Sequence, residues 1–170
     1  MTTVVASVDV SRPPETVFPY VTDPARFGEW QAGVLGGGTD GEPGVGTTCS
    51  ITRRIGGAER TSTAEITELS PPERWVIRGI DGHIRASVEV SVQPAGDGQH
   101  SKVTVSLGFS GRGIGRLLVP LAVRQARREV PRSCRELKAR LEAASAGPQE
   151  AVAAASSASQ SANASVPAKT

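Results

Sequence analysis

The sequence predicts an α+β fold in which a curved antiparallel sheet of about seven strands wraps around a long C-terminal helix, in the order β-α-α-β6-α. Three observations predict it. An alternating strand precedes two short segments with proline in their first turns, five or six further segments alternate with period two, and one long stretch, Gly113 to Ala144, has helical periodicity. A single long helix is therefore available to cover one face of the sheet.

Length and composition allow one folded domain. The chain has 170 residues, of which 38% are hydrophobic and 21% charged, enough for one core. We assign residues 1–144 to a ligand-binding domain and 145–170, which are rich in alanine and serine, to a disordered tail. Because no apolar run of about eighteen residues and no signal-peptide pattern is found, we expect a cytoplasmic protein.

The first strand and the two short helices follow directly from local patterns. Residues Thr3 to Val10 alternate between apolar and polar positions. Ser11 is a candidate N-cap for a helix whose first turn holds Pro13 and Pro14, and Asp23 before Pro24 predicts a second cap and a second short helix ending near Gly28.

The middle of the chain is predicted to be a meander of strands. Turn signals at Gly56-Gly57 and Asp81-Gly82 separate strands that each have one apolar face, as expected for an antiparallel sheet with one face in water. The predicted strands are Ala32 to Gly36, which is weak, Thr47 to Ile55, Arg60 to Leu69, Arg74 to Ile80, His83 to Val92, and one carrying Val103, Val105, Leu107 and Phe109.

Two apolar stripes mark the long helix. The first joins Ile114, Leu117, Leu118, Leu121 and Ala122; the second joins Val130, Cys134, Leu137 and Leu141. We expect both stripes to face the sheet and Pro120 and Pro131 to bend the helix, leaving room beneath its middle.

That room is the predicted ligand site. The inward strand positions are small and aliphatic, with Trp30 expected at the mouth and Arg53 and Gln125 as possible polar contacts. Arg53 shares the side of Cys49 and Ile51 by alternation; the alternative is that local twist near the hairpin turns it outward. The alternative is that Leu117, Leu121, Phe109 and Trp75 fill the space. The predicted ligand-binding residues are Trp30, Cys49, Ile51, Arg53, Val88, Val105, Phe109, Leu117, Leu121 and Gln125.

The sequence contains no recognisable catalytic motif. His83, His100 and the hydroxyl of Tyr20 are expected at the surface, and Cys49 and Cys134 are expected to be buried small hydrophobes. We therefore predict neither a metal site nor a cofactor, and we assign no catalytic residue.

Positive charge is concentrated in the last helix. Residues 1–111 carry 9 basic and 13 acidic groups, whereas 112–142 carry 9 basic and 3 acidic groups. This surface is either solvated or makes weak contact with a membrane or an anionic partner through Arg124, Arg127 and Arg128. Nucleic acid is not expected, because aromatic residues are not interleaved with the arginines.

Several motifs resemble those of the START/Bet v 1-like (SRPBCC) superfamily with the helix-grip fold, in particular its polyketide cyclase/dehydratase-like branch. The resemblance covers residues 3–144. The matching motifs are Pro-Pro-Glu-Thr-Val-Phe (13–18), Thr-Asp-Pro-Ala-Arg-Phe-Gly-Glu-Trp (22–30), Gly44-Val45-Gly46-Thr47, Glu-Leu-Ser-Pro-Pro-Glu-Arg (68–74) and Arg-Glu-Leu-Lys-Ala-Arg-Leu-Glu (135–142).

The resemblance implies binding of a small hydrophobic molecule such as a lipid, a quinone or a polyketide, for transport or sensing. A cofactor-free polyketide cyclase or dehydratase acting in the same cavity is the alternative. Both a monomer and a homodimer remain open.

Overall fold

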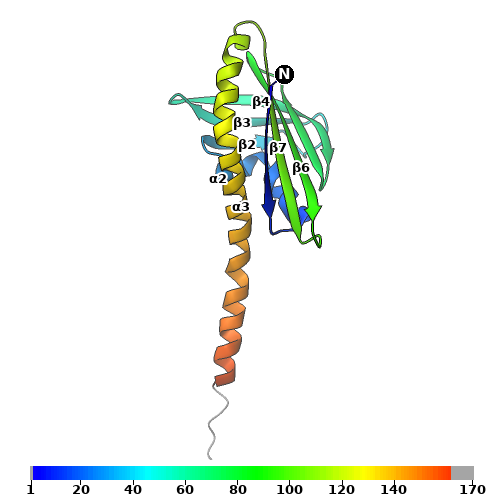
Figure 1. Cartoon of the computed structure of the whole chain (residues 1–170), viewed down its shortest axis with the longest axis vertical. Coiled ribbons are helices and arrows are strands. Elements are labelled where there is room, and N and C mark those ends of the chain that lie inside the picture. The colour runs from blue at the N-terminus through cyan, green and yellow to red at the C-terminus, as the bar shows by residue number, and fades with distance from the viewer. Residues whose placement is uncertain (1, 162–170) are drawn as a thin grey trace, which may run out of the picture.

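The computed structural model describes the backbone of residues 2–161 and the side chains of residues 2–144. The sheet has seven antiparallel strands in the order β1-β7-β6-β5-β4-β3-β2 and curves around the helices (Figure 1), so the predicted α+β helix-grip architecture is confirmed. The elements are β1 (Thr2–Val10), α1 (Pro14–Thr22), the 3-10 turn η1 (Pro24–Arg26), α2 (Phe27–Trp30), β2 (Val34–Thr39), β3 (Thr48–Ile55), β4 (Ala58–Ser70), β5 (Arg74–Gly79), β6 (Ile84–Ala95), β7 (His100–Gly111) and α3 (Gly115–Ser161).

The hairpin between β3 and β4 closes as predicted. Gly56 and Gly57 have φ angles of +58° and +85°, which glycine adopts without the steric cost that a side chain would bring. The weak first strand of the meander also forms, but it lies at Val34–Thr39 rather than at Ala32 to Gly36.

The two short helices begin differently. Asp23 caps the second as predicted, since its side chain accepts a hydrogen bond of 2.9 Å from the backbone N–H of Ala25. The prediction for Ser11 was wrong, because Pro13 is the N-cap residue of α1 and makes no side-chain cap. The backbone N–H of Ser11 instead donates to a carboxylate oxygen of Glu142 in α3, at 2.9 Å.

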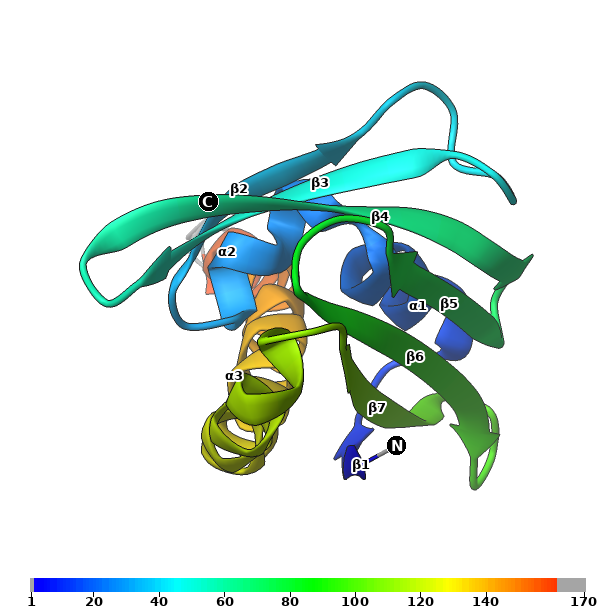
Figure 2. The ribbon, with the colours of Figure 1, turned by 90° about the horizontal axis from the view of Figure 1, so that it is seen from above.

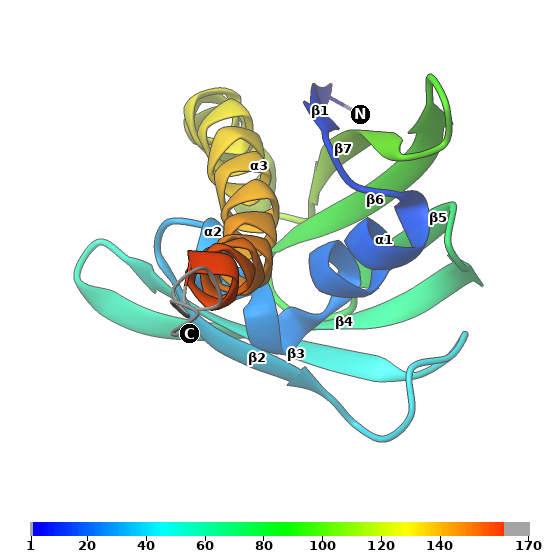
Figure 3. The same cartoon turned by 90° about the horizontal axis from the view of Figure 1, so that it is seen from below.

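Helix α3 lies against the β1 and β7 side of the sheet (Figure 2), with α1 and α2 inside the curve of the sheet beside it (Figure 3). It passes through Pro120 and Pro131 as one uninterrupted helix. Its buried residues are Val123, Ala126, Val130, Cys134, Leu137 and Leu141.

Helix α3 is also longer than predicted, because it continues to Ser161, past the expected end at Ala144. Of the predicted disordered tail, residues 162–170 lie outside the described residues. The division of the chain at residue 144 stays a prediction.

Candidate functional site

The face of the sheet that points toward α3 is closed at one end and open at the other. Near α1, the inward valines of β6 and β7 are buried; these are Val90, Val92, Val103 and Val105. Toward the start of α3, the next inward residues, Val88, Leu107 and Phe109, are only partly buried although they point the same way. These apolar side chains face inward and are incompletely covered; we call the region between them and α3 the hollow.

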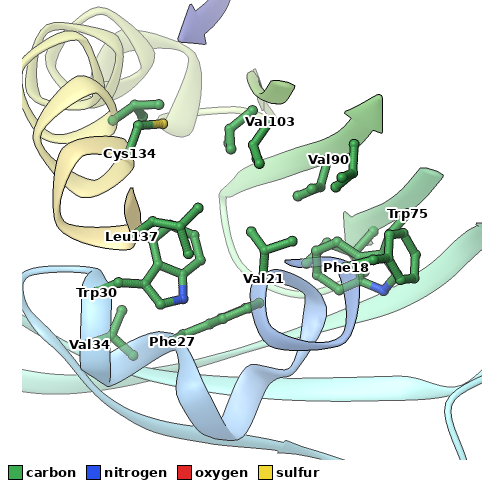
Figure 4. Close-up of a cluster of buried hydrophobic side chains, with 14 of the residues drawn as sticks. Phe18, Val21, Phe27, Trp30, Val34, Trp75, Val90, Val103, Cys134 and Leu137 are labelled. Carbon is green, nitrogen blue, oxygen red and sulfur yellow. The ribbon is translucent and has the colours of Figure 1, made fainter. Parts of the chain in front are cut away.

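Aromatic packing closes the other end (Figure 4). The ring of Phe27 makes edge-to-face contacts with Trp30 and Trp75, at centroid separations of 5.8 and 6.0 Å. Such pairs add about 0.5 to 1.5 kcal/mol each beyond the area they bury. Trp30 is 5% exposed and its indole N–H is buried without a hydrogen-bond partner among the described residues, so Trp30 is part of the core rather than of the mouth, where we expected it.

Arg53 is a charged residue on the inner face of β3. It follows Cys49 and Ile51 on the same face of β3, and both of those residues are buried, at 1% and 8% exposure. The Arg53 guanidinium donates one hydrogen bond, of 2.7 Å, to the side-chain oxygen of Gln31. Because a guanidinium carries five N–H donors, further donors are left for a guest molecule.

The pKa of Arg53 is shifted by its surroundings. Burial lowers the pKa of its guanidinium, and the Glu129 carboxylate on α3 opposes that effect. The two groups are not in contact at salt-bridge distance, so they influence each other across the space between β3 and α3. Glu129 is partly buried and accepts a hydrogen bond of 2.8 Å from Gln125.

The predicted site residues thus divide into four groups. Val88 and Phe109 are partly buried on the inner face of the sheet with Val105 buried beside them, and Arg53 is partly buried on β3. Trp30, Cys49 and Ile51 lie in the core, and Gln125 is exposed.

Leu117 and Leu121 form the fourth group, and their predicted orientation was wrong. They are 80% and 65% exposed. At 3.6 residues per turn, their stripe lies about 180° around the helix from the buried stripe. The sequence holds two apolar stripes but only one can face the sheet, and the longer one, from Val123 to Leu141, is the one that packs.

Sequence reasoning missed Gln31 and Glu129. The contact of Gln31 with Arg53 spans 22 residues, and no local pattern reports it. Glu129 carried a weak signal, because it stands beside Val130 and three residues after Ala126, at the edge of the stripe that packs.

Two cavities lie on the flanks of α3. One, of about 240 Å³, lies between α3 and the segment from Gly28 to Val34 and is bordered by Trp30. The other, of about 470 Å³, lies between α1 and α3. Arg26 and Arg140 on its wall are paired with carboxylates, at 3.5 Å from Asp23 and 2.9 Å from Glu136, whereas Arg12 on the same wall donates to the Leu141 carbonyl at 3.1 Å.

Among residues 2–144, the two cysteines are buried and the two histidines are exposed. Burial raises the pKa of the Cys49 and Cys134 thiols, the latter to about 11, so both are protonated at neutral pH, as the expectation of buried hydrophobes requires. His83 and His100 are exposed, and the Tyr20 hydroxyl donates to Glu29 at 2.6 Å. Residues 2–144 contain no cluster of metal-ligating side chains.

The described part of the chain contains no helix with the length and apolar character needed to cross a bilayer.

Comparison with solved structures shows the same fold at low sequence identity. The protein TTHA0849 from Thermus thermophilus superposes with a TM-score of 0.69 and 20% identity, covering 85% of this chain and 99% of that one. The Zhui aromatase/cyclase from Streptomyces sp. R1128 gives 0.69 and 15%, covering 83% and 93%. A START superfamily protein from Mycobacterium smegmatis gives 0.65 and 16%, covering 82% and 97%.

No curated protein sequence matches this chain significantly. The sequence profile of one family does match, over residues 1–142, and that family is described as polyketide cyclase / dehydrase and lipid transport. Since the match spans most of the chain and the helix-grip fold is the one found here, the protein belongs to the polyketide cyclase / dehydrase and lipid transport family.

Proposed function

We propose that this protein binds a small, largely apolar molecule in the open end of the hollow between the sheet and α3, with Arg53 holding a polar group of that molecule. The observation that carries the proposal is the difference in burial along one face. Val90 and Val105 are buried, whereas Val88, Leu107 and Phe109 point the same way and are only partly buried. Covering those side chains would be favourable, at about 25 cal/mol for each Å² of apolar surface removed from water.

The polar end of the guest follows from Arg53. A guanidinium with free donors in a partly buried position favours an oxygen acceptor, and its planar fork suits a carboxylate, a quinone oxygen or a ketone. An apolar body with one such group describes a fatty acid, a quinone or a polyketide-like compound. The family description, which names both polyketide chemistry and lipid transport, supports the same class.

Native mass spectrometry of the protein purified from its own host tests this proposal. We expect an additional mass on the wild-type chain that is released on denaturation and has an apolar character. Arg53→Ala should hold clearly less of it, because the polar contact is lost. Arg54→Ala is the matched control, since Arg54 lies on the opposite face of β3 and pairs with Glu59 at 3.3 Å at the surface.

A second variant keeps the test informative if Arg53→Ala alters the hairpin. Val88→Phe fills part of the hollow from the sheet side, so it should lower occupancy while the protein stays folded. Equal occupancy in wild type, Arg53→Ala and Val88→Phe, or no guest in any of them, would count against a ligand in this hollow.

The position of Glu129 favours a second candidate function, that of a cofactor-free cyclase or dehydratase. In this mechanism the Glu129 carboxylate takes a proton from a carbon between two carbonyl groups, and Arg53 stabilises the enolate oxygen that forms. The enolate carbon then attacks a further carbonyl of the same chain, which closes the ring and leaves an alkoxide that takes the proton back from Glu129. Loss of that hydroxyl together with a proton from the neighbouring carbon releases water and forms the ring double bond.

This candidate is tested by incubating the protein with a synthetic poly-β-ketone and following aromatic product by absorbance. Glu129→Gln should lower the rate by about 10²-fold or more, the usual contribution of general base catalysis. Glu136→Gln is the control, because Glu136 pairs with Arg140 at the surface at 2.9 Å. A rate no higher than that without protein would leave binding as the function.

A further inference from the structure

The start of α3 carries an exposed apolar stripe. Four residues form this stripe, which we call the outer stripe: Ile114, Leu117, Leu118 and Leu121. Their side chains are 66%, 80%, 46% and 65% exposed. Ile114 lies in the turn just before α3, and the three leucines continue from it at helical spacing on the face of α3 opposite the buried stripe. A contiguous group of large apolar side chains in water is unusual for a folded domain and marks an interaction surface.

Unpaired positive charge surrounds the outer stripe. Residues 112–128 contain five arginines and no acidic residue. All five are exposed, and among the side chains that the structure describes none of them lies within salt-bridge distance of a carboxylate; they are Arg112, Arg116, Arg124, Arg127 and Arg128.

The arginines that follow the stripe continue the same face. At 3.6 residues per turn, Arg124, Arg128 and Arg132 fall within about 60° of the direction in which Leu121 points. The outer face of α3 therefore changes along its length from aliphatic to basic, with the buried stripe on the opposite side holding the helix to the sheet.

We propose that this outer face of α3 docks on the surface of a bilayer that contains anionic lipid. The four aliphatic side chains enter the boundary between headgroups and acyl chains, and the arginines pair with lipid phosphates and carboxylates, as in helices that lie in the membrane interface. Charge decides between a bilayer and a second copy of the chain. Two copies meeting through their outer stripes bring arginines together with no carboxylate from residues 112–128 to balance them.

Docking in this way brings the open end of the hollow to the membrane. Phe109 lies two residues before the end of β7, and the backbone N–H of Arg112 donates to the His83 carbonyl at 2.9 Å, so the start of α3 is tied to the rim of the hollow. An apolar guest would then pass between bilayer and hollow with little exposure to water. This consequence rests on the proposed ligand role, whereas docking itself does not.

Vesicle flotation of the purified full chain tests the proposal. The probes are vesicles of phosphatidylcholine alone and vesicles that also contain phosphatidylserine. We expect the wild type to float with the anionic vesicles and to be released as sodium chloride is raised, because salt screens the arginines. We expect two double variants each to weaken binding at least about tenfold. One is Leu117→Asp with Leu121→Asp, which removes apolar side chains from the membrane interface. The other is Arg124→Glu with Arg128→Glu, since each basic residue near an anionic surface contributes about fivefold.

Val45→Asp is the matched control for the leucine variants, because Val45 is 68% exposed in the loop before β3 and far from α3 in sequence. Lys102→Glu serves the same purpose for charge, as an exposed residue of β7. Both controls should bind vesicles as the wild type does.

Three results would overturn the proposal: no flotation with anionic vesicles, equal loss in the control variants, or a fall in oligomer mass by light scattering in the leucine variants with vesicle binding unchanged. The last would identify the outer stripe as an interface between copies. Because flotation needs no occupied hollow, its failure leaves the mass-spectrometric test of ligand binding untouched, and the reverse also holds.

Discussion

The side chains of Arg53 and Gln31 are joined by a hydrogen bond of 2.7 Å, which connects the end of β3 to the residue that follows α2. This bond fixes one arm of the guanidinium, and the guanidinium makes no other side-chain hydrogen bond among residues 2–144. Gln31 is partly buried and acts through Arg53, so it is a positioning residue for any guest held by Arg53.

Replacing Gln31 should therefore affect stability and binding together. We expect Gln31→Ala to lower the free energy of unfolding by about 1 to 3 kcal/mol, because the partly buried Arg53 loses a partner. Gln125→Ala removes a hydrogen bond of similar length, 2.8 Å to Glu129, at an exposed position and should cost less. Urea denaturation of the two variants measures the difference, and equal losses would mean that the Arg53 contact contributes no more than a surface bond.

The two apolar stripes of α3 should respond oppositely to truncation. Leu137 is 0% exposed, so Leu137→Ala should destabilise the protein by about 2 to 5 kcal/mol through lost contacts and a cavity. Leu117 is 80% exposed, and Leu117→Ala should change stability by no more than about 0.5 kcal/mol. Thermal denaturation of both variants checks the orientation of α3, and a large loss for Leu117→Ala would contradict it.

The directions of Arg53 and Leu117 show which parts of the site could be predicted from the sequence. Alternation with Cys49 and Ile51 left two directions open for Arg53, inward or, through local twist near the hairpin, outward; in the structure its guanidinium donates to Gln31. The direction of Leu117 could not be predicted in the same way, because a helix with two apolar stripes has two amphipathic solutions and only packing against β1 and β7 selects one. The role of Gln31 could not be predicted, because its contact with Arg53 is tertiary and spans 22 residues.

The start of α3 depends on a glycine. A side chain on Gly115 would overlap the His83 carbonyl group, because the first turn of α3 lies directly against the loop between β5 and β6. We expect Gly115→Ala to push α3 away from this loop, with a loss of stability of roughly 1 to 3 kcal/mol from overpacking. Gly38→Ala is the control, since nothing lies within 4 Å of the new carbon there.

Hydrogen exchange of the backbone amide of Arg112, which donates to His83 at 2.9 Å, reports the displacement directly. It should be faster in Gly115→Ala than in wild type and unchanged in Gly38→Ala. Unchanged protection in both variants would show that the loop moves aside at no cost.

Alkaline pH should weaken the fold through Cys134. Burial raises the pKa of this thiol from 9.0 to about 11 in the folded state, while the unfolded chain keeps the lower value. The associated stability is therefore complete below pH 9.0 and is lost as pH rises toward about 11, because the unfolded state releases its proton first. The loss from this group is on the order of 2 kcal/mol.

Cys134→Ala isolates this contribution, since tyrosine and lysine residues titrate equally in both proteins. We expect the stability difference between wild type and Cys134→Ala to shrink between pH 9.0 and about 11, measured by urea denaturation at each pH. Native alkylation with iodoacetamide at pH 8 gives a second measure, and Cys134 should react far more slowly than in the denatured chain because a buried, protonated thiol is a poor nucleophile. A constant stability difference together with rapid alkylation would place Cys134 in contact with water and contradict its position in the buried stripe of α3.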